Sequence, residues 1–204
     1  MKQVRVYVEG GGDQRSGKAA VREGFSKFLR PLREKARENR IRWDVIACGS
    51  RKSAFDDFKI ALCLHPDAFN VLLVDAEGPV SQRPWTHLHQ RNGWSKLEIS
   101  DDNCHLMVQV MEAWLIADLV TLANFYGQGF NLNPIPKQSD VESVSKVDLE
   151  LGIKIATQNT QKGEYHKIRH GVKILALVDT EKVRSRTRHC ERMFTILLEK
   201  LTES

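Results

Sequence analysis

Acidic side chains follow two apolar, strand-like runs of this 204-residue chain, at the point where each run ends. Residues 4–8 lead directly into Glu9, and residues 71–74 lead into Asp75 and, two residues on, Glu77. In an open parallel α/β sheet, ligands bind outside the carboxyl ends of the strands. If the two runs are neighbouring strands, the three carboxylates meet there and need a cation or shared protons to offset their repulsion. Oxygen ligands of this kind suit Mg²⁺ or Mn²⁺, so the pattern predicts a divalent-metal site for phosphoryl transfer.

A further acidic residue falls at the same predicted edge. Glu112 lies where a strand over residues 104–110 is followed by a helix over residues 111–125. It is a candidate member of the acidic set, although a glutamate in a first helical turn is equally explained by the helix dipole. Lys162 and Lys167 lie in a polar stretch between two predicted helices. Either could neutralise charge on a transferring phosphate, and a plain surface turn is the alternative.

A glycine-rich turn follows the first strand. Glycine lets the backbone come close to a phosphate. The candidate cofactor-binding residues of the turn are Gly10, Gly11, Gly12 and Asp13. The run that ends in Lys18 has the G-x-x-x-x-G-K spacing of a nucleotide-binding P-loop, but Ala19 replaces the hydroxyl that would hold Mg²⁺. A nucleotide site that uses Lys18 and a simple turn whose amides form an anion nest both remain alternatives.

The order of the elements predicts an α/β fold with a mostly parallel sheet flanked by helices. Pro31 interrupts the first helical pattern, so that helix should kink or form two pieces, and Ser53 is the expected cap of the second helix. Residues 76–102 have the composition of a long loop above the strand ends. The strand-like segments are residues 3–8, 41–48 and 69–74, and the helical segments between them are residues 16–39 and 53–64.

Beyond a linker over residues 127–137, three helices are expected, over residues 140–158, 165–178 and 180–201. We therefore expect an α/β core over residues 1–126 and a helical C-terminal extension over residues 137–204 that packs on the core.

Charge is distributed unevenly along the chain. Residues 1–60 carry 15 Lys and Arg against 8 Asp and Glu, residues 61–136 carry 3 against 8, and residues 137–204 carry 13 against 10. An acidic middle between basic flanks is typical of a metal site within a polyanion-binding surface, so nucleic acid is an expected partner. Basic helix faces that are simply solvated are the alternative.

Composition sets further bounds. Hydrophobic residues make up 41% and charged residues 28%, which is typical of globular domains. We expect no membrane association, because no apolar run approaches the ~20 residues of a membrane span. The four cysteines are widely spaced and form no CxxC pair, as is usual for thiols in a reducing compartment. These features favour a cytoplasmic location.

The acidic motifs resemble the Toprim domain of topoisomerases, primases and several nucleases, which has a glutamate followed by glycine and then an Asp-x-Asp motif. Here Glu9 and Gly10 match the first motif, and Asp75 matches the second, with Glu77 in place of its second aspartate. More closely, the chain resembles a bacterial family of uncharacterised Toprim-like proteins often encoded beside an ATPase in phage-defence loci. The segments that carry this likeness are residues 8–13, 73–77, 105–114 and 162–167.

The resemblance implies a Toprim-like fold and a Mg²⁺- or Mn²⁺-dependent nuclease that acts with a partner ATPase. Glu9 would be a metal ligand or general base, Asp75 and Glu77 would hold the metal, and Glu112 would complete the acidic set. Lys162 or Lys167 would contact phosphate. The alternative is a non-catalytic regulatory subunit whose degenerate acidic site only binds nucleic acid or nucleotide.

Overall fold

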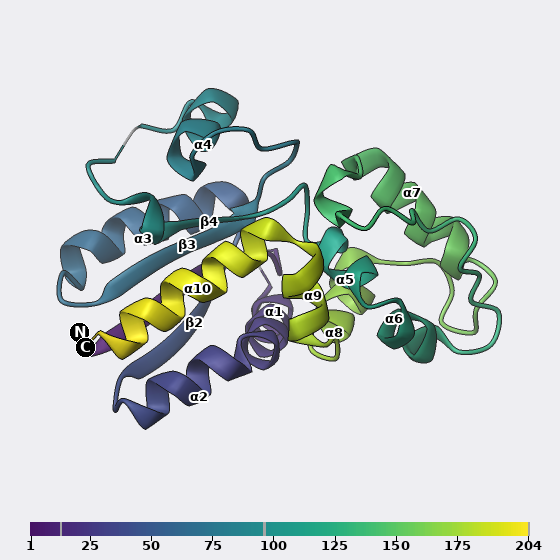
Figure 1. Ribbon diagram of the computed structural model, residues 1–204, viewed down its shortest axis with the longest axis horizontal. Coiled ribbons are helices and arrows are strands. Elements are labelled where there is room, and N and C mark those ends of the chain that lie inside the picture. Colours follow the sequence, from purple (N-terminus) through teal and green to yellow (C-terminus); the bar gives the residue numbers. More distant parts are fainter. Residues whose placement is uncertain (13, 96, 204) are drawn as a thin grey trace.

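The computed structural model describes residues 1–12, 14–95 and 97–203, and these residues form an α/β fold (Figure 1). Four parallel strands form one sheet in the order β2-β1-β3-β4. They are β1 (Gln3–Glu9), β2 (Arg42–Gly49), β3 (Phe69–Asp75) and β4 (Cys104–Met107). The predicted parallel α/β sheet is confirmed. Because β1 and β3 are neighbours, with Val6 in register with Val71, the two acidic strand ends lie side by side.

The first helical region is in two pieces, as predicted. Helix α1 (Arg15–Phe28) ends at Leu29, and α2 (Arg30–Glu38) begins with Pro31 in its first turn, where a missing N–H costs no intrahelical bond.

Helix α3 (Arg51–Leu64) begins two residues before the predicted start. Its cap is Ser50 and not Ser53, because the Ser50 hydroxyl accepts a hydrogen bond from the Ser53 N–H. The earlier start brings Arg51 into the first turn, next to the carboxyl end of the sheet.

The segment predicted as a loop over residues 76–102 contains a helix, α4 (Pro84–Asn92). Proline at its start and Gly93 in the left-handed conformation at its end are ordinary helix boundaries. Trp85 and Leu88 are buried beneath α4, and the Trp85 ring lies 5.7 Å from the ring of Phe58. The prediction of an open loop was therefore wrong over these residues, because apolar contacts hold a short helix there.

The chain continues through shorter helices than predicted. Strand β4 ends at Met107, and the helix expected after it is divided at Asp118, whose carboxylate accepts a hydrogen bond from the Thr121 N–H. The helical C-terminal portion is confirmed. The elements are α5 (Glu112–Ala117), α6 (Leu119–Tyr126), α7 (Lys146–Thr157), a π-helix (Lys167–Gly171), α8 (Val172–Leu175), α9 (Thr180–Arg186) and α10 (Arg188–Thr202), with short 3-10 turns at Asp101–Asn103 and Val141–Ser143.

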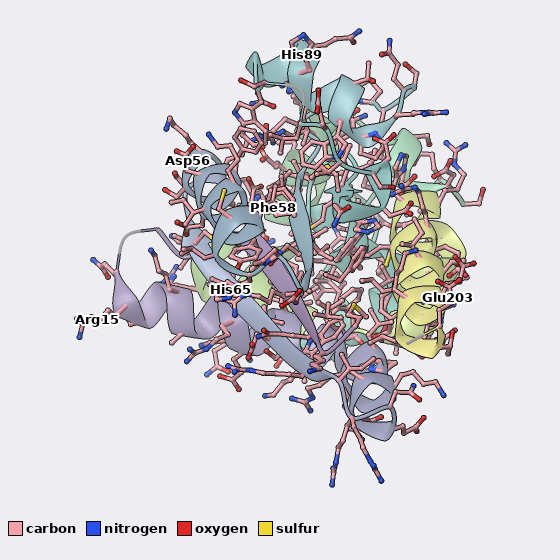
Figure 2. The ribbon with its side chains drawn as sticks, turned by 90° about the vertical axis from the view of Figure 1, so that its left-hand side faces the viewer. Arg15, Asp56, Phe58, His65, His89 and Glu203 are labelled. Carbon is pink, nitrogen blue, oxygen red and sulfur yellow. The ribbon has the colours of Figure 1, made fainter. Side chains whose placement is uncertain are left out.

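The sheet is covered on both faces, and its side chains alternate between two buried clusters. One cluster contains Val6 of β1 and extends through α1, α2 and α10. The other contains Tyr7 and lies beneath α3 and α4; on α3, Phe58 points toward the sheet while Asp56 points outward (Figure 2). Helices α6 and α7 lie beyond one end of the sheet, at the right of Figure 1. Within the described residues, no helix is both long enough and apolar enough to span a bilayer.

Candidate functional site

Three carboxylates converge at the carboxyl edge of the sheet. Glu9 Oε1 accepts a hydrogen bond of 2.9 Å from the Asp75 N–H, which ties the end of β1 to the end of β3. Asp75 Oδ1 accepts a bond of 2.7 Å from the Met111 N–H, and Glu112 follows as the first residue of α5. Asp75 is 2% exposed and Glu112 is 1% exposed. The parallel topology thus brings together acids from three separate segments.

A lysine from the C-terminal portion reaches into this acidic cluster. Lys167 Nζ lies 2.8 Å from Asp75 Oδ2 and 3.4 Å from Glu112 Oε2. Burial lowers the pKa of Lys167, but the negative charges of Asp75 and Glu112 outweigh this effect and leave its pKa raised. The ammonium therefore carries its charge throughout the physiological range. Its position depends on the π-helix, a rare geometry often found at functional sites.

Tyr165 forms a hydrogen bond with the other carboxylate oxygen of Glu112. Its hydroxyl donates a hydrogen bond of 2.8 Å to Glu112 Oε1. Burial raises the pKa of Glu112, although the charge of Lys167 opposes the shift. Within the described residues, Glu112 Oε2 is buried and accepts no hydrogen bond. A buried carboxylate oxygen without a hydrogen-bond donor is a position that a bound cation or a donor from a ligand would satisfy.

Glu9 has a strongly raised pKa. Its pKa is raised to about 8, mainly because burial removes the carboxylate from water and also because the negative charge of Asp75 is close. Its side chain is partly exposed, but only toward a recessed cavity, so protein surrounds most of the carboxylate. A carboxyl group in this condition can exchange a proton near neutral pH, which is what general acid–base catalysis needs.

Two of the acids, Glu9 and Asp75, border a cavity of about 360 Å³ between β1, α1 and the 167–172 segment, and Glu112 is buried behind its lining. Glu9, Asp75, Arg51 and Lys167 line one part of it. The remaining walls are the glycine turn and the apolar side chains of Val21, Phe25, Met107, Met111, Ile168 and Val172. A pocket with a few convergent charged groups and apolar walls is the common form of a ligand site.

The glycine turn has a backbone that other residues rarely adopt. Gly10, Gly11 and Gly12 have φ angles of 121°, 88° and 58°. At Gly11 a Cβ would lie 2.7 Å from the backbone of Gly17 and Lys18, so the turn packs directly against the first turns of α1. All three glycines line the cavity, as their predicted role requires, whereas Asp13 lies outside the described residues.

Two residues predicted for the site lie elsewhere. Glu77 Oε2 is 2.5 Å from Lys146 Nζ, and this hydrogen bond leaves the pKa of Glu77 lowered even though burial alone would raise it. Glu77 is not among the residues that line the cavity. Lys162 Nζ lies 5.3 Å from the ring centroid of Phe125 and borders a different surface hollow, which separates it from the acids.

The structure also adds a cation that the sequence did not indicate. Arg51 donates one guanidinium N–H to the carbonyl of Asp75 and another, at 3.1 Å, to Asn92 Oδ1. Its guanidinium lies 5.5 Å from the ring centroid of Trp94. The only local signal was its place just after Gly49 and Ser50, at the end of the strand next to β1.

The predicted metal at Glu9, Asp75 and Glu77 stays a prediction. Among the residues that the structure describes, no group of three or more His, Cys, Asp or Glu side chains is arranged to hold a metal ion. Both Asp75 oxygens already accept hydrogen bonds, from Met111 N and from Lys167. The donor type alone suits a hard cation, since Glu9, Asp75 and Glu112 supply only carboxylate oxygens, and Glu112 Oε2 accepts no hydrogen bond although Lys167 Nζ lies 3.4 Å away.

Comparison with known proteins gives a family without an assigned activity. Residues 8–198 match the model of a family described as Domain of unknown function (DUF4276). The match spans nearly the whole chain, so the chain belongs to this family. Neither the curated proteins nor the solved structures contain a significant match.

Proposed function

We propose that this chain is a Toprim-like, Mg²⁺- or Mn²⁺-dependent phosphodiester hydrolase that acts on nucleic acid. The observation that supports it best is the convergence of Glu9, Asp75 and Glu112 at the carboxyl edge of the sheet, where Glu9, Asp75 and Lys167 line a cavity and Glu112 is buried beside them. Three acids and one lysine leave an excess of negative charge in a desolvated place. Such a site favours either a proton or a divalent cation.

Glu9 and Asp75, with Glu112 beside them, are the residues that would hold the metal. Glu77 is a weaker candidate than the sequence suggested, because its carboxylate pairs with Lys146 outside the cavity. A bound divalent cation would polarise a phosphoryl oxygen and lower the pKa of a coordinated water.

Other side chains of the site could stabilise charge on the phosphate and accept a proton during phosphodiester cleavage. Lys167 and Arg51 carry positive charge to the cavity, where it would stabilise the negative charge on a phosphate. If Asp75 and Glu112 hold the metal and Glu9 does not, the raised pKa of Glu9 would let it accept a proton from an attacking water. Gly10 to Gly12 let a phosphate come close to the backbone.

The partner ATPase and the role in phage defence rest on family likeness alone. We include them in the proposal because the four motifs of the resemblance contain the acids of the cavity. An ATPase that opens or delivers nucleic acid would supply substrate to a recessed site of this kind.

A regulatory subunit is the second candidate, and one observation favours it. Lys167 already pairs with Asp75 and Glu112 and offsets part of their charge, as a site that has lost its metal would require. Such a subunit would bind nucleic acid or nucleotide without cleaving it.

The test is cleavage of labelled single-stranded and duplex DNA and RNA in Mn²⁺, in Mg²⁺ and in EDTA. We expect metal-dependent cleavage by the wild type and loss of at least 100-fold in Glu9→Gln and Asp75→Asn. Asp67→Asn, in the exposed turn before β3, is the matched control and should retain activity. Binding without cleavage that survives Glu9→Gln and Asp75→Asn would establish the regulatory subunit instead.

A further inference from the structure

We infer that the substrate is a single-stranded nucleic acid, whose strand lies in a groove between α1 and residues 167–173 and places one unstacked nucleotide in the acidic cavity. The inference rests on the proposed function and names its substrate class. Three observations carry it: the burial of the acids, a second hollow that adjoins the cavity, and the basic side chains of that second hollow.

The acids are too deeply recessed for the backbone of an intact duplex. Asp75 and Glu112 are almost completely buried, and the cavity that reaches Asp75 encloses only about 360 Å³. Duplex DNA is stiff, with a persistence length of about 50 nm, so its backbone does not bend into a small cavity. A phosphate can approach Asp75 only if its nucleotide leaves the stack and enters the cavity, and that step costs least for a single strand.

A second hollow adjoins the cavity and shares four of its lining residues. Gly11, Gly12, Ile168 and Val172 line both spaces, and the second runs along Ser16, Gly17 and Ala20 of α1. Ile168 stands at the junction and is 50% exposed. Ile168 offers an exposed apolar contact for an unstacked base, in place of the aromatic ring on which bases usually stack in such grooves.

The first cavity has both acidic and basic side chains, whereas the second hollow is lined by basic side chains and by no carboxylate of the described residues. Arg169 and Lys173 line it, and within the described residues neither makes an ion pair with a carboxylate. On the neighbouring α2, Arg30 pairs with Glu34 and Lys35 pairs with Glu38, whereas Arg33 and Arg37 make no ion pair within the described residues. The pattern fits a strand whose reacting phosphate lies at the acids and whose adjoining phosphates lie along Arg169 and Lys173.

The test measures binding apart from cleavage. A fluorescent 12-nucleotide single strand and the matching duplex are titrated with full-length protein in EDTA, and fluorescence anisotropy is recorded at several salt concentrations. We expect the single strand to bind at least 10-fold more tightly than the duplex. Arg169→Ala with Lys173→Ala should weaken single-strand binding roughly 10-fold and reduce the slope of log K against log salt by about 1.4, the loss of two phosphate contacts.

Arg33→Ala with Arg37→Ala removes two equally exposed arginines from α2 and serves as the matched control. Equal affinity for single strand and duplex, or equal effects of the two double variants, would overturn the inference. So would a mononucleotide that competes as well as the 12-mer. These outcomes are independent of the cleavage assay, because a duplex nuclease would cleave in Mn²⁺ and still show no preference for single strands.

Discussion

Glu9 Oε1 accepts a hydrogen bond from the backbone N–H of Asp75, so the acid at the end of β1 is held against the acid at the end of β3. The contact follows from the strand order, since β1 and β3 are neighbours and both point their carboxyl ends at the same edge. Two carboxylates fixed in this way repel one another, and Lys167 offsets only part of their charge. The stability and the chemistry of the site should therefore depend on the same few groups.

Removing the ammonium of Lys167 should destabilise the fold. Lys167→Met leaves Asp75 and Glu112 buried without their cation, and breaking such a pair costs about 3 kcal/mol, at the lower end of the usual range because Lys167 is half exposed. Urea unfolding at pH 8 measures this loss. At pH 5 the loss should be smaller, because burial raises the pKa of Glu112 and this carboxylate can then take up a proton.

Lys162→Met is the control for that experiment, since it removes a lysine that lies only over the ring of Phe125. Its effect should stay within about 0.5 kcal/mol. Equal losses in the two variants would show that the pairing of Lys167 contributes nothing to stability.

The raised pKa of Glu9 predicts how stability varies with pH. Its folded-state pKa is about 8 and its unfolded value about 4.5. Between these values the folded state keeps a proton that the unfolded state releases, so the free energy of unfolding falls as pH rises from about 4.5 to 8. In Glu9→Gln this decrease should be weaker, and at pH 8 in EDTA the variant should be more stable than the wild type, by at most about 4 kcal/mol.

Urea titrations at pH 5, 6.5 and 8 check this prediction. Glu199→Gln, an exposed position on α10, should follow the wild type at every pH. A Glu9→Gln profile parallel to that of the wild type would mean that Glu9 ionises normally.

The glycine turn offers a matched pair of substitutions. Gly12→Ala should cost only about 1 kcal/mol, because its φ of 58° is strained for alanine but a Cβ would meet no atom within 4 Å. Gly11→Ala should cost more than about 2 kcal/mol, because its Cβ would also lie 2.7 Å from the backbone of α1. Thermal unfolding of both variants measures the difference, and equal losses would contradict the close approach of turn and helix.

Much of the candidate site could be predicted from local sequence. Strand residues with valine at alternate or successive positions located β1 and β3, and the acids after them could be placed at one edge from parallel topology alone. Glu112 was found in the same way, because it follows β4. The break at Pro31 was predicted from the missing N–H of proline.

The basic residues of the site, Lys167 and Arg51, could not be predicted from local sequence. Lys167 reaches the acids from a π-helix 92 residues after Asp75 in the chain, and nothing local distinguished it from Lys162. The place of Arg51 depends on the start of α3, which is capped by Ser50 two residues earlier than predicted. Glu77 seemed equivalent to Asp75 because the two are close in sequence, yet Lys146 draws its carboxylate away from the cavity. Tertiary contacts, which leave no periodic signal, decided each of these placements.

The central claim is that Glu9 and Asp75 form a divalent-metal site, and calorimetric titration with Mn²⁺ tests it without substrate or partner. The wild type should bind Mn²⁺ saturably, and Asp75→Asn should lose at least 10-fold in affinity, while Asp67→Asn binds as the wild type does. Circular dichroism confirms that each variant is folded. Absence of saturable binding to the folded wild type, or equal binding by Asp75→Asn, would contradict the claim.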